Sequence, residues 1–414
     1  MQSTLLDSLG VPRRYRSTVA THSAAWTLFG LFAGGATQQL GFIIRTIGGS
    51  PVLVAVVTSG PYAFALFSML YAPMLERFRA GSIVASSRFV CAALLLAVPL
   101  RPTALSLTLL GLAALVSVRV GETFYGRLLA ELYPGELRGR LQSLPLFAQA
   151  LALTAASLAA GWVLRSSEAA YRWLLPLLAP AGMAAALLVS RLGRGTPRSE
   201  GGSRGGAARA GRAAFAEVVR DRPFLLWTLV YSVTTVGFWL VQSSLPVYFA
   251  SVLHLGYWEN GVVLAAFNGL YCVGFLLWGR ILDRVKSLPT MMLSWTFTGL
   301  GVLIIALGGK LGAALAGQAL AGLALAGNDI AWYPVVLEFA PAHRVDRYMG
   351  VYMTAVGARA LVGGGAGALL MSASADGSRT ALLAASAFML VGSLAMLPLR
   401  RAPPGSPPPP TAPP

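Results

Sequence analysis

The chain has 414 residues, of which 56% are hydrophobic and 11% are charged, whereas a soluble domain carries about 25% charged residues. This composition excludes a soluble globular protein and indicates an integral membrane protein. The formal net charge of +17 would also suit a nucleic-acid-binding protein, but the positions of the basic residues argue against that class.

Apolar runs of about 20 residues recur along the whole chain, and this is the length at which an α-helix crosses roughly 30 Å of hydrocarbon. We therefore predict an all-α integral membrane protein with twelve transmembrane helices. The predicted spans are residues 24–46, 51–74, 82–100, 103–129, 141–164, 171–191, 224–250, 259–279, 289–308, 311–337, 348–372 and 379–399.

These spans divide the chain into five segments. Residues 24–191 and 224–399 are predicted to form two bundles of six helices, joined by a cytoplasmic linker at 192–223 that is rich in Gly, Ser and Arg. Residues 1–23 form a cytoplasmic N-terminal segment without the apolar core of a cleavable secretory signal. Residues 400–414 are rich in proline and are predicted to be disordered.

The basic residues follow a rule of membrane topology. With both termini in the cytoplasm, 23 of the 32 Lys and Arg residues lie in cytoplasmic segments, 6 lie in outer loops and 3 lie within spans. This bias is the positive-inside rule, and attraction to anionic lipid headgroups explains the positive charge without nucleic acid. We therefore expect a multi-pass protein of the plasma membrane, or cell inner membrane, with both termini cytoplasmic and no nucleic-acid partner.

A repeat with a constant offset of 207 residues relates the two bundles. Chance matches of charged residues would not keep one register over about seventy residues, and in an apolar chain such a repeat indicates a duplicated membrane bundle. The matched pairs are Glu76 with Asp283, Arg77 with Arg284, Arg79 with Lys286, Glu122 with Asp329, Glu131 with Glu338, Pro134 with Pro341, and Arg140 with Arg347. The two halves are therefore expected to be pseudo-symmetric.

Charged groups inside the predicted spans are candidates for function, because a charge near the bilayer centre costs about 2.5–3.5 kcal/mol even on a lenient scale. Arg119 and Glu122 are three residues apart on the fourth span, so they share a helix face and can pair. Asp329 and Arg359 lie on the consecutive tenth and eleventh spans and are expected to pair with each other. Arg88, near the cytoplasmic end of the third span, is expected to extend its side chain toward the headgroups.

Polar amides inside the spans are candidates to line a substrate cavity, although each suits a hydrogen bond between helices equally well. They are Gln38, Gln39, Gln149, Gln242, Asn268 and Asn328. Cys91 and Cys272 lie in spans of different halves and are expected to be small core residues. His22 and Trp26 lie near a span end and are expected at the membrane interface. We expect no metal site and no cofactor.

A charged pattern follows the second span of each half. The second half supplies Gly279, Asp283, Arg284 and Lys286, and the first half supplies Ala72, Glu76, Arg77 and Arg79. With twelve spans in two repeated halves and a long basic linker, the chain resembles the major facilitator superfamily of secondary transporters over nearly its whole length. The signature of that family in this loop is a glycine, three variable residues, Asp-Arg, one variable residue, Gly and two basic residues, and here Ala72 and Glu76 depart from it.

This resemblance implies that the charged pattern is a cytoplasmic gate. A carboxylate at a helix end can bind both an arginine and the positive N-terminal end of a neighbouring helix. By resemblance, Glu76 would contact the start of the eleventh span and Arg138 or Arg140, and Asp283 would contact the fifth span and Arg344 or Arg347. The alternative is that the basic residues of the pattern only determine topology.

The fourth span also matches part of a signature of the drug–proton antiporter branch of this family. That branch carries an arginine followed by polar and glycine positions, and here residues 119–123 read Arg-Val-Gly-Glu-Thr. Glu122 stands where glutamine is usual. The Gly-Pro-x-x-Gly-Gly run of that branch is absent from residues 144–161, so efflux by proton exchange is one expectation and uptake by proton symport is another.

We therefore expect a monomeric secondary active transporter of a small molecule, a drug or a metabolite, with protons as the coupling ion. Glu122 or Asp329 would carry the proton, with Arg119 and Arg359 as counter-ions, and protonation of either acid would favour an anionic or zwitterionic substrate. No catalytic residues and no nucleotide-binding loop are recognised, so an enzyme is not expected. A uniporter, and a non-transporting receptor or assembly factor with the same fold, are the alternatives.

Overall fold

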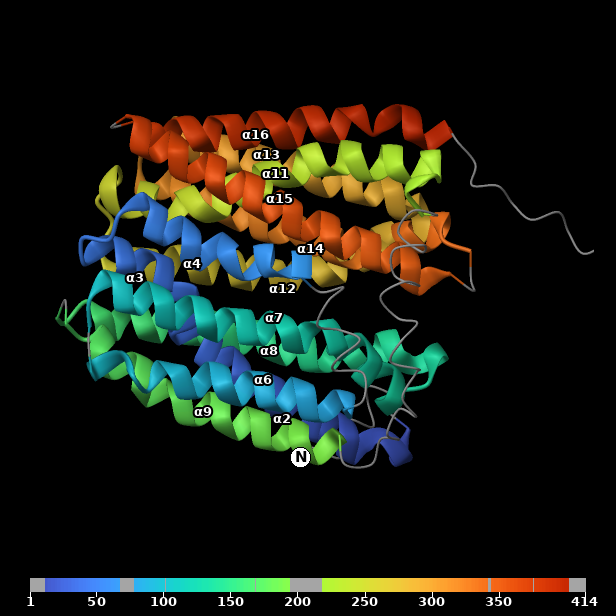
Figure 1. Cartoon of the computed structure of the whole chain (residues 1–414), viewed down its shortest axis with the longest axis horizontal. Helices are drawn as coiled ribbons and strands as arrows, with labels where there is room; N and C mark the ends of the chain where they lie inside the picture. Colours follow the sequence, from blue (N-terminus) through green and yellow to red (C-terminus); the bar gives the residue numbers. More distant parts are fainter. Residues whose placement is uncertain are drawn as a thin grey trace, which may run out of the picture.

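The computed structural model describes residues 12–67, 78–100, 102–167, 169–193, 218–341, 344–374 and 376–401, and this part of the chain is helical without strands (Figure 1). The first half contains α2 (Arg16–Gly35), α3 (Leu40–Thr46), α4 (Pro51–Ala63), α6 (Ala80–Leu95), α7 (Ala104–Leu132), α8 (Gly135–Leu164) and α9 (Tyr171–Leu192). The second half contains α11 (Arg222–Ser251), α12 (Tyr257–Val285), α13 (Ser287–Gly308), α14 (Leu311–Phe339), α15 (Val345–Ala373) and α16 (Gly377–Ala395). Short 3₁₀ helices are η1 (Arg13–Tyr15), η2 (Thr37–Gln39), η3 (Phe64–Phe67), η4 (Val98–Leu100) and η6 (Leu397–Arg401).

The prediction of twelve membrane-spanning helices is confirmed. Eleven helices in the described residues are long and apolar enough to cross a membrane, and a shorter apolar helix, Pro51–Phe67, occupies the place of the second span. The predicted remainder of that span, residues 68–74, lies outside the described residues. The predicted N-terminal and C-terminal tails and most of the linker, residues 194–217, also lie outside them.

The first span differs from its prediction because it begins earlier and is broken. It runs from Arg13 to Thr46, although the apolar pattern placed its start at residue 24. At Ala36 the backbone leaves regular α geometry (φ −116°, ψ −69°), and η2 connects α2 to α3. A 3₁₀ stretch inside a span re-aims the side chains that follow it.

Three of the described helices begin with a capping side chain. Ser50 accepts a hydrogen bond from the backbone of Leu53 at the start of α4, Thr103 forms a capping box with Ser106 at the start of α7, and Asp221 accepts one from Phe224 at the start of α11. Each cap binds a backbone N–H that has no partner within its helix.

The bundle has two ends. α9 ends and α11 begins at the right-hand end in Figure 1, which we call the linker end, and α3 ends and α4 begins at the other, which we call the loop end. α11, α13 and α16 lie at the top of this view and α2, α6 and α9 at the bottom. Across the halves, α8 packs against α12, and α4 packs against α15 and α11.

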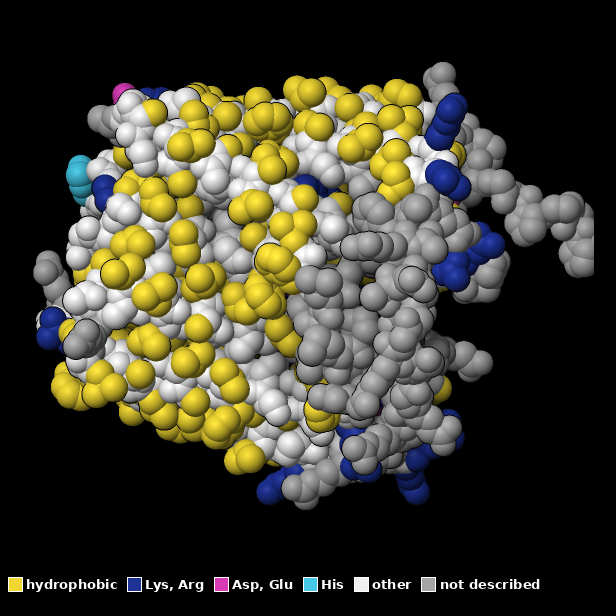
Figure 2. Space-filling view, in the orientation of Figure 1, with side chains coloured by type: hydrophobic (Ala, Val, Ile, Leu, Met, Phe, Trp, Pro, Cys, Tyr) yellow, Lys and Arg dark blue, Asp and Glu magenta, His cyan; other side chains and the backbone are white. Residues whose placement is uncertain are grey.

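The surface agrees with a membrane protein. Figure 2 shows apolar side chains spread over the helices and basic side chains at the two ends of this face. Leu177 and Leu369 are each 74% exposed on the helix surface, as lipid-facing leucines are. Cys91 and Cys272 are free and buried, which confirms them as core residues.

Candidate functional site

A cavity of about 400 Å³ lies between the halves and is lined by both of them. Most of its wall is apolar, as is usual for small-molecule sites. Its charged residues are Arg119 and Glu122, and its amides are Gln38, Gln149, Gln242, Asn260 and Gln318. Three of the six amides predicted to line a cavity therefore do so: Gln38, Gln149 and Gln242.

Arg119 and Glu122 form an ion pair on one face of α7, as their spacing predicted. The Arg119 guanidinium carbon also lies 4.0 Å from the centre of the Tyr62 ring on α4, and that ring lies 4.3 Å from Trp239 on α11. Arg119 Nε is buried without a hydrogen-bond partner. The Glu122 side chain is 49% exposed and that of Arg119 is 23% exposed, so the pair is open to the cavity on the acidic side.

Asp329 occupies the equivalent position of the second half but makes different contacts. Its carboxylate accepts a short hydrogen bond from the Tyr271 hydroxyl on α12 and one of 3.2 Å from the amide of Asn328. The Tyr231 hydroxyl donates to Asn328 Oδ1 at 3.0 Å. Asp329 is exposed, but neither it nor Asn328 lines the 400 Å³ cavity.

The expected pair between Asp329 and Arg359 is not formed in this structure. Arg359 is buried, its Nε donates to the carbonyl of Ala355 at 2.9 Å, and its Nη1 has no hydrogen-bond partner. Its guanidinium carbon lies 5.0 Å from the ring centre of Tyr231 and 5.2 Å from that of Tyr352. The expectation was wrong because Tyr231, from α11, contacts the arginine with its ring and the Asn328–Asp329 pair with its hydroxyl.

The expectations for Arg88, His22 and Trp26 were also wrong. Arg88 is 7% exposed and lies between the rings of Trp26 and Phe29, so it does not extend to the headgroups. His22 is fully buried; its Nδ1 lies 2.9 Å from the Tyr133 hydroxyl. These polar groups form one cluster where α2 packs against α6 and the end of α7. The cluster could not be predicted from the position of each residue along its own helix, because it contains residues from three spans.

Three of the predicted amides, Gln38, Gln39 and Asn268, take part in two bridges between the halves at the loop-end side of the cavity. The amide nitrogen of Asn268 donates to Gln38 Oε1 at 2.9 Å, and that of Asn260 donates to Gln39 Oε1 at 2.8 Å. Gln39 and Asn268 are buried behind the cavity wall. Asn260 was not singled out from the sequence because it lies near the predicted start of its span.

Part of the predicted cytoplasmic gate lies outside what the structure describes. This applies to Glu76 and Arg77, and to the side chains of Arg138, Arg140 and Asp283. Arg79, Arg284, Lys286 and Arg347 are exposed at the linker end, and Gly279 has open space where a Cβ would lie. The latch therefore stays a prediction.

The sequence analysis missed the tyrosines of the site. Tyr62 and Tyr271 bind Arg119 and Asp329, while Tyr231 and Tyr352 enclose Arg359. Their positions inside the predicted spans carried a usable signal, because a phenolic hydroxyl that is removed from water needs a hydrogen-bond partner.

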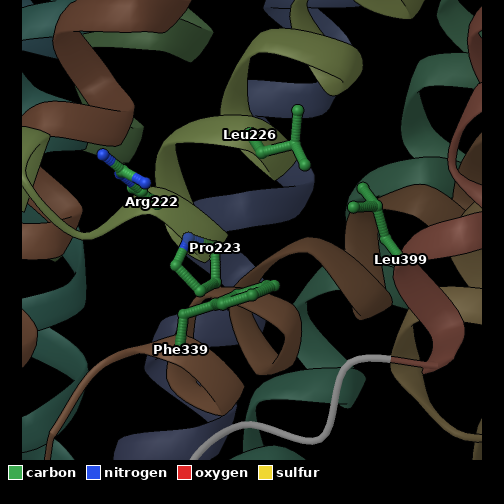
Figure 3. A pocket seen from close by; sticks show the side chains of 5 residues that line it. All are labelled: Arg222, Pro223, Leu226, Phe339 and Leu399. Atoms are coloured by element: carbon green, nitrogen blue, oxygen red, sulfur yellow. The ribbon is translucent and has the colours of Figure 1, made fainter.

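A second hollow of about 250 Å³ lies at the linker end, away from these charges. Figure 3 shows its lining side chains, which come from α11, the end of α14 and η6. They are Arg222, Pro223, Leu226, Phe339 and Leu399. Among the described residues, this lining has a single charged group, Arg222, and no acid.

Comparisons with known proteins agree with this architecture. The sequence profile of the Major Facilitator Superfamily matches residues 17–315 and 261–414. Among solved structures, a bacterial homologue of the human lysosomal transporter Spinster, inward-facing and unoccupied, is 16% identical with a TM-score of 0.67, covering 95% of this chain and 100% of its own. The nucleoside transporter NupG is 14% identical with a TM-score of 0.66, covering 93% and 99%. No characterised protein was matched by sequence search.

A peptide-bound transporter of the POT family is also similar, at 11% identity and a TM-score of 0.70, covering 93% of this chain and 96% of its own. At such identities the likeness shows the fold alone. The substrates of these proteins are therefore not transferred to this chain.

Proposed function

Since the chain belongs to the major facilitator superfamily, a family of membrane transporters, we propose that it is a secondary active transporter that couples movement of a small molecule to protons through Glu122. The observation that carries this proposal is the Arg119–Glu122 pair on the cavity wall. Glu122 is half exposed, so it can exchange protons with water. Its partner Arg119 also lines the cavity, so the charge of Glu122 affects how strongly a substrate binds to Arg119.

Protonation of Glu122 changes the charge of the cavity. With Glu122 ionised, its charge and that of Arg119 cancel. Proton binding neutralises the carboxylate, which leaves Arg119 without its counter-ion, and a second anion is then favoured at the guanidinium. Arg119 Nε already lacks a hydrogen-bond partner. We therefore propose an anionic or zwitterionic substrate with an apolar body, bound together with a proton.

Two features support a cycle of alternating access. The side-chain hydrogen bonds between the halves described above lie toward the loop end, while Glu122 remains exposed. If the linker end is cytoplasmic, as the positive-inside rule requires, these bonds join the halves on the side away from the cytoplasm. Rocking of the halves about the cavity would then expose the same pair to the other side.

Asp329 is the second candidate for the proton. It is exposed and is the repeat mate of Glu122. However, it does not line the cavity and already accepts two hydrogen bonds. This arrangement favours Glu122 as the group that senses substrate.

Purified protein in liposomes tests the proposal. Lumenal pH would be followed while apolar-bodied carboxylates, zwitterions, neutral amides and lipophilic cations are added in turn. We expect substrate-evoked proton flux from the anions or zwitterions, its loss in Glu122→Gln, and its retention in Glu131→Gln. Glu131 is a matched control because it lies on the same helix, paired with Arg127 and away from the cavity.

The sign of the proton flux distinguishes symport from antiport. Proton flux that persists in Glu122→Gln and disappears in Asp329→Asn would contradict the assignment to Glu122. Substrate movement without any proton flux in the wild type would contradict proton coupling and leave a uniporter.

A further inference from the structure

The break in the first span places two consecutive amides against the other half. Gln38 and Gln39 lie in and at the end of η2, between α2 and α3. Consecutive side chains on a regular α-helix point about 100° apart, yet both of these reach α12. Their partners, Asn260 and Asn268, are eight residues apart, which is slightly more than two turns, so they share one face of α12.

The four amides form two separate hydrogen-bonded pairs that lie side by side because Gln38 and Gln39 are consecutive residues. Gln38 and Asn268 are reciprocally bonded, with Asn268 Nδ2 donating to Gln38 Oε1 at 2.9 Å and Gln38 Nε2 donating to Asn268 Oδ1 at 3.4 Å. Ser157 on α8 adds bonds of 3.4 Å to both partners. Asn260 donates to Gln39 at 2.8 Å. Every bond except that between Ser157 and Gln38 joins the two halves.

Two further polar contacts between the halves lie closer to the loop end. Arg45 Nε donates to Ser251 Oγ at 2.7 Å, and the hydroxyls of Thr46 and Tyr257 lie 2.6 Å apart. The amide pairs are thus the inner part of a polar seam between the first span and α11 or α12. The seam separates the cavity from the loop end.

Each amide pair has one member on the cavity wall and one behind it. Gln38 and Asn260 line the cavity, although Asn260 is only 3% exposed, whereas Gln39 and Asn268 are buried and do not line it. Gln39 Nε2 is buried without a partner, so the Gln39–Asn260 pair contains an unused donor. A polar group in the cavity can therefore compete for Gln38 without first opening the seam.

We infer that these four amides are the gate that closes the cavity toward the loop end, and that Gln38 links this gate to the substrate. The inference rests on the proposed alternating-access function. A substrate group that carries a donor and an acceptor side by side, such as an amide or a protonated carboxyl, satisfies Gln38 in place of Asn268 and so loosens the bridge. Arg119 and Gln38 then recognise different parts of one substrate.

The gate is tested by the distance across the loop end. Spin labels would be placed at the exposed positions Ser166 in the first half and His254 in the second, in full-length protein with Cys91→Ala and Cys272→Ala. A hydrogen bond present in one state alone biases the equilibrium by up to about tenfold. We expect Gln38→Met and Asn260→Leu to increase the long-distance population by roughly three- to tenfold without any substrate.

The matched control for the gate is Gln242→Met, which removes a cavity amide that makes no hydrogen bond to the first half among the described residues. Its distance distribution should equal that of the wild type. A Gln38→Met distribution indistinguishable from this control would overturn the gate. This result is independent of transport, so it stands apart from any failure of the proposed function.

The link to substrate is tested by comparing two variants in the liposome assay. Gln38→Met and Asn260→Leu should open the seam alike, but Gln38→Met should raise KM several-fold more because it also removes a substrate contact. Equal KM values for the two variants would show that Gln38 acts in the gate alone and does not contact the substrate.

Discussion

The guanidinium carbon of Arg88 lies 3.7 Å from the centre of the Trp26 ring and 4.4 Å from that of Phe29. Arg88 comes from α6 and the two aromatic residues from α2. Its Nη1 is buried without a hydrogen-bond partner. A cation held by ring faces inside a bundle is stabilised by cation–π attraction, which is worth about 2 kcal/mol when it is desolvated.

Substitutions at this contact should have unequal effects on stability. Trp26→Ala removes a buried aromatic ring and leaves the cation without its nearest partner, so we expect a loss of about 3–5 kcal/mol. Arg88→Met keeps the volume and removes the charge, so we expect a change within about 1 kcal/mol. Thermal unfolding in detergent would measure both. A loss on Arg88→Met as large as that on Trp26→Ala would show that the charge itself is required.

The crossing of α8 and α12 depends on two glycines. A Cβ on Gly161 would lie 2.8 Å from the carbonyl oxygen of Tyr257 and 3.0 Å from the Cα of Gly261. Gly161→Ala should therefore force the loop-end junction apart and destabilise this conformation by about 1–3 kcal/mol. The spin-label distance across the loop end would show it as a larger long-distance population.

Gly126→Ala is the control for this crossing. Gly126 lies inside α7, and a Cβ at this position would have no neighbouring atom within 4 Å among the described residues. Because alanine is the better helix former, this change should raise stability by roughly 0.5–1 kcal/mol and leave the distance unchanged. If both glycine variants behaved alike, the close crossing would not control the conformation.

Much of the architecture could be predicted from the sequence, because membrane crossing requires long apolar helices and the repeat fixes their pairing into halves. The Arg119–Glu122 pair could be predicted because both residues are on one helix. Predictions made from the position of a residue along its own helix were wrong wherever its partner lay on a different helix. Arg88 meets Trp26, and Arg359 meets Tyr231, through packing of spans that are distant in the sequence.

The partners of the amides in the polar seam also could not be predicted from the sequence. Gln38 and Gln39 were identified as polar residues inside a span, but a regular helix would have pointed them in different directions. The break at Ala36 aims both toward α12. No proline marks this break in the sequence, so its effect on the side chains required the structure.

The start of α11 provides a test at the linker end. Asp221 Oδ1 accepts from the Phe224 backbone at 3.3 Å, and Oδ2 accepts from the Tyr348 hydroxyl of α15 at 2.5 Å. Asp221→Ala removes the cap and the bridge between helices, so we expect a loss of about 1–2 kcal/mol in thermal unfolding. Asp221→Asn keeps an oxygen for the cap and should lose less than half as much. Equal losses in the two variants would contradict the capping role.

The hydroxyl of Tyr271 allows the two candidate proton sites to be separated without removing either acid. It donates to Asp329, whereas Glu122 lies on the other half and pairs with Arg119. A donated hydrogen bond stabilises the ionised carboxylate, so Tyr271→Phe should disturb transport only if Asp329 carries the coupling proton.

Transport by Tyr271→Phe then identifies the coupling acid. Because we assign the proton to Glu122, we expect the rate of substrate-evoked proton flux in this variant to stay within about twofold of the wild type. A loss of roughly tenfold would instead place the coupling proton on Asp329, because a hydrogen bond to a charged group is worth about 1.5 kcal/mol or more. Tyr333→Phe, which changes a half-exposed tyrosine on α14 that makes no hydrogen bond to either acid among the described residues, controls for general effects of a lost hydroxyl.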